Sequence, residues 1–373
     1  MSSRIKQSDY TYRLEKIQAL LQDQQQDALL LTLGKNFQYL LGSNAHLMER
    51  LVLAIVPSEG QPELVSPTFE VGNFAKTTPI PLDRIHPWEE TEDPYQLTKE
   101  VLGRLGIADG SFVLTPSTPF TLYSKIHSYL PHAAFTDAYP LLKDARLSKT
   151  EGELACLQEA NTLTAQAIEA TFDQLEEGMT EKEVAVLLRR ELTDRSGEEV
   201  PFAIVQFGVN TADPHGLPTD KKLQPGEVVL IDAGTTVEGY NGDITNTTVF
   251  GKPSADFLKV YAIVEEAQER AVDKARDGTP AEQVDQAARA YITEEGYGQY
   301  FTHRTGHGVG LDVHEDPYIV GGNVTPLALG QTHSVEPGIY IPGQFGVRIE
   351  DIVEVGQDRA IRLANPARRY WER

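Results

Sequence analysis

Four acidic residues in the second half of the chain recur at matched places in an internal repeat. The first copy, L-x2-G-x5-D-x-G, spans residues 223–234, and the second, L-x2-G-x5-E-x-G, spans residues 327–338. Each copy carries one acid and is followed by another on a second strand-like stretch. Two similar halves that face each other would bring four carboxylates to a shared centre. In chain order they are Asp232, Asp243, Glu336 and Glu350.

Converging carboxylates are chemically informative because they cannot all stay ionised in a buried space. Desolvation and mutual repulsion raise their pKa values, and divalent cations relieve both costs. Asp232 lies in the apolar run Val228–Gly234, while Asp243 and Glu350 interrupt stretches 239–250 and 347–355, which we expect to be strands. Any one of these acids could simply be hydrogen-bonded or solvated, but the repeated pattern favours a metal site.

Histidines cluster beside these acids. Of the nine histidines in the chain, His215, His303, His307, His314 and His333 fall within 120 residues. His307 lies in T-G-H-G-V-G, where glycines permit close backbone approach, and His215 occupies a place in the first half that corresponds to His314 in the second. The clustering favours a functional role for these three. His303 is functional or structural, and we expect His333 to be structural.

The elements that would position these residues fall into two units. Up to residue 146, alternating helix and strand signals predict an α/β domain, with a hairpin formed by Leu51–Val56 and Glu63–Ser66. A second unit, 147–373, would begin with a capping box at Ser148 and Glu151. In each half of this unit, the pattern predicts two helices followed by two strands. Later helix starts are expected at Thr180 with Glu183 and at Thr279–Pro280 with Glu282.

Composition excludes several classes of function. The 373 residues hold 33 Lys and Arg against 55 Asp and Glu, a formal charge of −22, which disfavours nucleic acid and anionic membranes as partners. No apolar run approaches the roughly 20 residues that span a bilayer, and the polar start lacks a secretory signal. The single cysteine, Cys156, cannot form an internal disulfide. We therefore expect a cytoplasmic protein.

Four motifs resemble those of the pita-bread metallopeptidases. They are D-A-G-x7-G-D-I-T (232–245), H-R-T-G-H-G-V-G-L-D-V-H-E-D-P (303–317), E-P-G-I-Y (336–340) and G-V-R-I-E-D (346–351). The likeness is greatest to the proline-specific branch, Xaa-Pro dipeptidase (prolidase) and aminopeptidase P. It implies an α+β pita-bread catalytic domain with an internal pseudo-two-fold repeat, preceded by an α/β domain of the creatinase/prolidase type.

The resemblance also implies two divalent metal ions. Asp232 would chelate the first, Asp243 and Glu350 would bridge both, and His307 and Glu336 would complete the second. A donor set dominated by oxygen favours Mn2+, with Co2+ or Zn2+ as substitutes. A bridging hydroxide would then attack the scissile Xaa-Pro bond.

Other residues receive roles from the same resemblance. His215 and His314 would stabilise the tetrahedral intermediate, Glu336 would relay the proton of the water, and Arg348 would hold a carboxylate or contact the substrate. His303, Tyr340 and Arg50 are further candidate substrate contacts. Tyr340 could equally be a half-buried strand tyrosine without a role in the site. Arg50 lies in segment 44–50, which could be a surface loop, a lid or a contribution to a partner subunit. Asn246 stands where many relatives have arginine, which puts the substrate preference in doubt.

Substrate length stays open at the level of sequence. The compact chain favours Xaa-Pro dipeptides, and an aminopeptidase P acting on longer Xaa-Pro peptides is the alternative. A metal-free creatine hydrolase, a methionine aminopeptidase and a non-enzymatic peptide-binding module fit less well, because the ligand types are all present and a first domain precedes them. The expected partners are short proline-containing peptides and, from the family likeness, a second copy in a homodimer.

Overall fold

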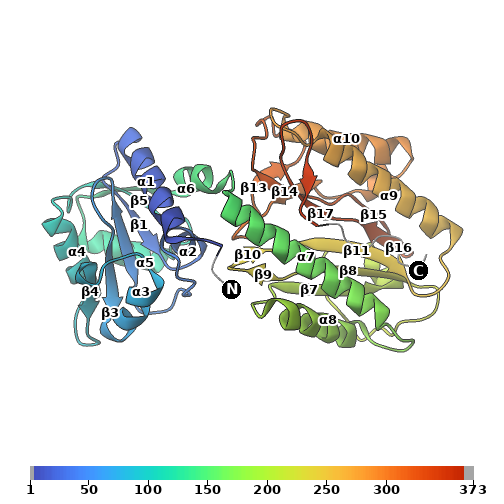
Figure 1. Ribbon diagram of the computed structural model, residues 1–373, viewed down its shortest axis with the longest axis horizontal. Coiled ribbons are helices and arrows are strands. Elements are labelled where there is room, and N and C mark those ends of the chain that lie inside the picture. The colour runs from blue at the N-terminus through green and yellow to red at the C-terminus, as the bar shows by residue number, and fades with distance from the viewer. Residues whose placement is uncertain (1–3, 365–373) are drawn as a thin grey trace. The chain divides into compact units, whose positions relative to one another are not determined.

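The computed structural model describes residues 4–364, and its internal contacts divide the chain into two compact units. One unit comprises Ile5–Arg146, and the other comprises Arg4 together with the chain from Leu147 onward. Figure 1 colours the first from blue to green and the second from green to red. No helix within the described residues is long and apolar enough to cross a membrane.

The N-terminal unit is a six-stranded mixed sheet in the order β4-β3-β2-β1-β5-β6. Strand β1 is buried along its whole length, as expected for a central strand covered on both faces. The predicted hairpin is confirmed, because β2 pairs antiparallel with β3. The elements are α1 Gln7–Asp23, β1 Ala28–Thr32, α2 Lys35–Leu41, β2 Leu53–Pro57, β3 Glu63–Pro67, α3 Val71–Thr77, β4 Ile85–Trp88, α4 Pro94–Arg104, β5 Ser111–Leu114, α5 Phe120–Tyr129, β6 Ala134–Asp137 and α6 Tyr139–Arg146.

The C-terminal unit is built from two similar halves, each with a pair of helices and a set of antiparallel strands. In Figure 1 the helices α7 and α8 flank strands β7, β8 and β11, and α9 and α10 flank the strands of the second half. The first half contains α7 Glu151–Asp173, α8 Glu181–Ser196, β7 Phe202–Phe207, β8 Val228–Gly234, β9 Thr236–Val237, β10 Tyr240–Asn241 and β11 Ile244–Val249. The second contains α9 Ala255–Lys274, α10 Ala281–Glu294, β12 Gly306–Gly308, β13 Glu315–Ile319, β14 Thr332–Val335, β15 Gly338–Ile341, β16 Phe345–Arg348, β17 Asp351–Glu354 and β18 Ile361–Arg362.

Equivalent backbone hydrogen bonds show that the sequence repeat is a structural repeat. The N–H of Gly178 donates to the carbonyl of Leu223 at 2.9 Å, and in the second half the N–H of Gly278 donates to the carbonyl of Leu327 at 2.8 Å. Strand order agrees as well, since β7-β8-β11 corresponds to β12-β14-β17. The two halves therefore place Asp232 and Glu336 at related positions.

The helix starts correct two details of the sequence prediction. Helix α7 is capped by Thr150 and Glu153 in a capping box, whereas Ser148 forms an isolated β-bridge with Gln331 and is held in extended backbone. The Thr180 box is confirmed. At α10 the N-cap residue is Pro280, so no side chain caps this helix.

The expected strands 239–250 and 347–355 are each interrupted. In the first, β10 ends at Asn241 and β11 begins at Ile244. In the second, β16 ends at Arg348 and β17 begins at Asp351. The breaks contain Asp243 and Glu350, so both acids sit directly before a strand of the repeat rather than within one.

Candidate metal centre

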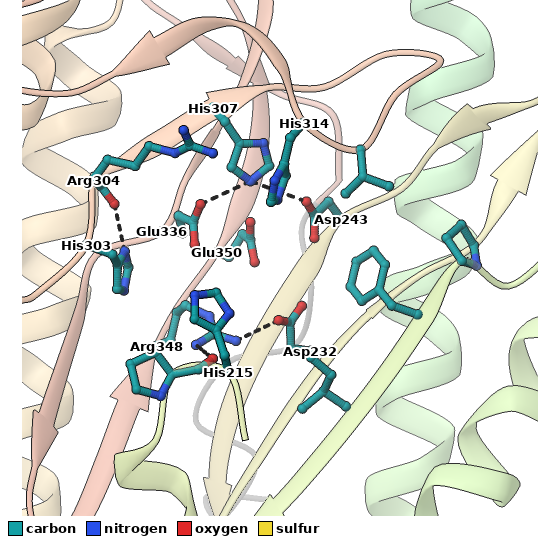
Figure 2. Close-up of a pocket in the computed structure, with 15 residues that line it drawn as sticks. His215, Asp232, Asp243, His303, Arg304, His307, His314, Glu336, Arg348 and Glu350 are labelled. Carbon is teal, nitrogen blue, oxygen red and sulfur yellow. Dashed lines mark hydrogen bonds and ion pairs between the residues drawn. The ribbon is translucent and has the colours of Figure 1, made fainter. Parts of the chain in front are cut away.

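A cavity of about 650 Å³ lies between the two halves of the C-terminal unit and collects most of the predicted site residues. Figure 2 shows their polar ends directed toward a common space. The lining residues are Pro201, Phe202, Ile204, Pro214, His215, Asp232, Asp243, His303, Arg304, His307, Val313, His314, Glu336, Arg348 and Glu350.

The acids reach this space from both halves. Asp232 is on β8, where it pairs with Thr245 of β11 on one side and Ile204 of β7 on the other. Glu336 follows the end of β14. Asp243 and Glu350 project from the two strand breaks, and Asp243 is fixed there because its N–H donates to Oδ1 of Asn161 at 3.0 Å.

His307 is the imidazole at the centre of the group. Its Nδ1 lies 3.1 Å from the carbonyl of Gly308, and since a carbonyl only accepts, Nδ1 carries a hydrogen. Its Nε2 lies 3.2 Å from Oε1 of Glu336 and 3.7 Å from Oδ2 of Asp243. Nε2 is therefore the ring atom that faces the carboxylates, as in metal-binding histidines. Burial favours the neutral ring, but the hydrogen bond and charge of Glu336 outweigh it and raise the pKa of His307.

Glycines on both sides of His307 let strand β12 fit between its neighbours. A Cβ on Gly306 would lie 2.0 Å from the carbonyl oxygen of Ser334, and one on Gly308 would lie 2.1 Å from that of Asp316. Any side chain at either position would push the strand away. The close approach predicted from the T-G-H-G motif is confirmed.

The carboxylates strongly perturb one another's pKa values. Burial, reinforced by neighbouring acids, raises the pKa values of Asp243 and Glu350 well above the ordinary range. Burial also raises the pKa of Asp232, although Arg348 opposes it. Burial acts on Glu336 too, but its hydrogen bond and ion pair with His307 outweigh it and lower its pKa to about 2. Without cations the site cannot hold all four charges.

Arg348 connects the acids to a chain of hydrogen bonds. Its Nη2 donates to Oδ2 of Asp232 at 2.6 Å, and its Nη1 donates to the Tyr340 hydroxyl at 2.9 Å. Nδ1 of His303 lies 2.7 Å from the Arg304 carbonyl and carries the hydrogen, so its Nε2 accepts from Tyr340 at 2.8 Å. Tyr340 thus reaches the site through two partners, although it does not line the cavity.

Sequence reasoning missed two hydroxyl groups that hold the acids. Thr245 accepts from Nε of Arg348 at 2.9 Å and donates to Oε2 of Glu350 at 2.6 Å. Ser334 donates to Oε1 of Glu336 at 3.1 Å and accepts from the N–H of His307 at 3.0 Å. Thr245 lies two residues after Asp243, on the side of β11 that faces Glu350, so strand alternation was the signal that could have identified it.

The remaining histidines occupy different surroundings. The rings of His314 and His307 are 3.9 Å apart, and burial together with the charge of His307 lowers the pKa of His314 to about 4. His215 lines the cavity from an exposed loop, where its own N–H donates to Asp213. His333 is fully buried beside the carbonyl of Ser334 and does not line the cavity.

Two residues named from the sequence lie outside this set. Arg50 belongs to the N-terminal unit, where it pairs with Glu49 and Glu90, and its contact with substrate stays a prediction. Asn246 is buried on β11 between two threonines whose hydroxyls meet Glu350 and the Arg348 carbonyl. Strand alternation places Asn246 on the opposite face, away from the acids.

The donor set fits divalent cations. Asp243, His307 and Glu350 offer ligand atoms that all lie within 4.8 Å of one another. Asp232 and Glu336 are outside this tightest group but line the same cavity, and Oδ1 of Asp232 is buried with no hydrogen-bond partner. A buried carboxylate oxygen without a donor is costly, and a cation would satisfy it. The residues present can therefore hold metal ions.

Comparison with known proteins agrees with this geometry. Residues 155–357 match the model of metallopeptidase family M24, and residues 13–148 match that of the creatinase/prolidase N-terminal domain. The chain belongs to metallopeptidase family M24. It is a metallopeptidase, with the pita-bread catalytic fold and the N-terminal domain that its motifs predicted.

Relatives extend over nearly the whole chain. A probable dipeptidase PepE from Mycobacterium tuberculosis is 37% identical over 358 residues, which are 95% of this chain and 94% of the relative. An Xaa-Pro dipeptidase from Lactobacillus helveticus is 36% identical over 349 residues, 92% of this chain and 94% of the relative. The crystal structure of a prolidase from Thermococcus sibiricus superposes with a TM-score of 0.90 at 35% identity, covering 96% of this chain and 98% of that one.

Proposed function

We propose that the protein is a metal-dependent Xaa-Pro dipeptidase, which hydrolyses the imido bond of Xaa-Pro dipeptides at a site for two divalent ions. The observation that carries the proposal is the convergence of four carboxylates and Nε2 of His307 on one cavity. Membership of family M24 and relatives named Xaa-Pro dipeptidase and prolidase support the substrate class. The chain would divide into an N-terminal domain, 1–146, and a catalytic domain, 147–373.

The five proposed metal ligands are those named from the motifs. Asp232 would chelate one ion, Asp243 and Glu350 would bridge the pair, and His307 and Glu336 would complete the second. Four carboxylates and one imidazole favour Mn2+, with Co2+ or Zn2+ as substitutes. The orphaned Oδ1 of Asp232 and the raised pKa values of Asp243 and Glu350, which burial causes, support this set.

Divalent ions held by these residues would supply an activated water and a Lewis acid for the scissile carbonyl. Glu336, whose pKa is lowered to about 2 by His307 against the effect of burial, stays ionised at neutral pH and would accept a proton from the attacking water. His314 is neutral because burial and the charge of His307 lower its pKa to about 4, and together with His215 it would donate hydrogen bonds to the developing oxyanion. Arg348 would keep Asp232 oriented.

We further propose a homodimer located in the cytoplasm. A single cysteine and an acidic surface support a reducing compartment and peptide rather than nucleic-acid partners. The dimer follows from the family likeness of the motifs.

The test of the activity is hydrolysis of Leu-Pro, Leu-Pro-Gly and Leu-Gly by the Mn2+-loaded protein, with a chelator control. We expect cleavage of Leu-Pro, loss of that activity with chelator, and cleavage of Leu-Pro-Gly and Leu-Gly slower by roughly 100-fold or more. Preference for Leu-Pro-Gly would make the protein an aminopeptidase P. No cleavage of either proline peptide, with metal bound, would favour a peptide-binding module.

A further inference from the structure

One permanent cation that lines the cavity has no acidic partner. Arg304 lies in the segment between His303 and strand β12, and its side chain lines the cavity. Within residues 4–364, no carboxylate lies within ion-pair distance of its guanidinium and no hydrogen bond occupies its N–H groups. An arginine beside four acids that pairs with none of them is available for a ligand.

The other arginine that lines the cavity is already committed. Arg348 is buried and its guanidinium is shared among Asp232, Tyr340 and Thr245. Arg304 is thus the permanent cation of this cavity that is free to bind an anionic group.

The Arg304 guanidinium is held by an aromatic ring rather than by an acid. It lies over the ring of Tyr318, with 4.4 Å between its Cζ and the ring centroid. Tyr318 in turn pairs with His307 across strands β12 and β13, so this contact is anchored to the strand that carries the central imidazole. A guanidinium carries five N–H donors in one plane, and pairs of them match the two oxygens of a carboxylate.

The direction of the side chain brings this cation toward the reacting centre. Figure 2 shows Arg304 entering the cavity from the segment before His307, with its guanidinium directed toward that ring. In an Xaa-Pro dipeptide the free carboxylate is separated from the scissile bond by the proline residue alone.

We propose that Arg304 binds the C-terminal carboxylate of the dipeptide through a bidentate pair and thereby selects dipeptides over longer peptides. The inference rests on the proposed Xaa-Pro dipeptidase activity and names the residue that sets substrate length. A longer peptide would present a neutral amide to the guanidinium in place of the carboxylate. The amide offers one acceptor and no charge, so it would lose most of the interaction.

The test compares Leu-Pro with Leu-Pro amide in the Mn2+-loaded wild type and in Arg304→Gln and Arg304→Lys. The wild type should prefer the acid. Arg304→Gln should raise KM for Leu-Pro by roughly 10- to 100-fold with a much smaller change for the amide. Arg304→Lys keeps the charge but loses the planar pair of N–H donors, so its KM for Leu-Pro should lie between those of the wild type and Arg304→Gln. Arg190→Gln is the matched control, because Arg190 is 78% exposed and pairs with Asp194 on a helix surface.

Binding of product gives a second readout that is independent of turnover. Free proline should inhibit the wild type more strongly than prolinamide, and Arg304→Gln should remove this difference while metal content and Tm stay at wild-type values. An unchanged preference for acid over amide in Arg304→Gln would overturn the assignment. A wild type that cleaves neither substrate would instead refute the dipeptidase activity, so the two failures are distinguishable.

Discussion

Asp243→Asn and Glu350→Gln should each reduce kcat for Leu-Pro by about 1,000-fold or more. Both side chains lie in strand breaks at the centre of the cavity, and each offers a ligand atom to the tight group around His307. An amide supplies one weak oxygen donor and no charge, so it cannot bridge two ions. Steady-state kinetics in saturating Mn2+, with metal content measured on the same samples, checks the result.

The control for the second substitution is Glu354→Gln on strand β17. Glu354 is four residues after Glu350 and is partly buried, but it does not line the cavity. It should retain wild-type metal content and turnover. Wild-type kcat in metal-loaded Asp243→Asn or Glu350→Gln would rule out the two-ion arrangement.

His215→Ala should lower kcat by roughly 100-fold while both metal ions are retained, because an oxyanion donor of this kind supplies about 100- to 1,000-fold. His215 lines the cavity from the loop after Asp213, outside the tightest ligand group. Its loss therefore removes a donor to the substrate without removing a ligand. Comparing kcat and bound metal between variant and wild type separates these effects.

His132→Ala serves as the control, since His132 is an exposed histidine of the N-terminal unit. Its kinetics should match the wild type. If His215→Ala loses both metals, the residue supports the metal site instead of the substrate, and its proposed role is wrong.

The sequence predicts the architecture well because the pattern of apolar residues and the internal repeat can both be read directly from it. The repeat L-x2-G-x5-[DE]-x-G identified related strands in the two halves, and the structure gives them matching hydrogen bonds. The helix start was predicted at the wrong capping box, because S-K-T-E-G-E contains two that overlap, at Ser148 and at Thr150. Pairing of Ser148 with Gln331, a residue far along the chain, decides in favour of Thr150.

The site was predicted as a set of residue types, but its connections were not. That Thr245 joins Arg348 to Glu350 follows from packing β11 of one half against the second half, which no local pattern reports. The partner of Ser334 is likewise set by strand β12 lying beside β14. The apolar wall formed by Pro201, Phe202 and Ile204 was missed, because ordinary strand residues carry no mark that they face a cavity.

The most direct test of the central claim is a titration of the metal-free protein with Mn2+, in which bound metal and Leu-Pro hydrolysis are measured on the same samples. We expect activity to appear only as metal binds, to saturate at two ions per chain and to disappear when a chelator removes them. Full activity in protein that holds no metal, or saturation of activity with a single ion bound, would contradict this claim.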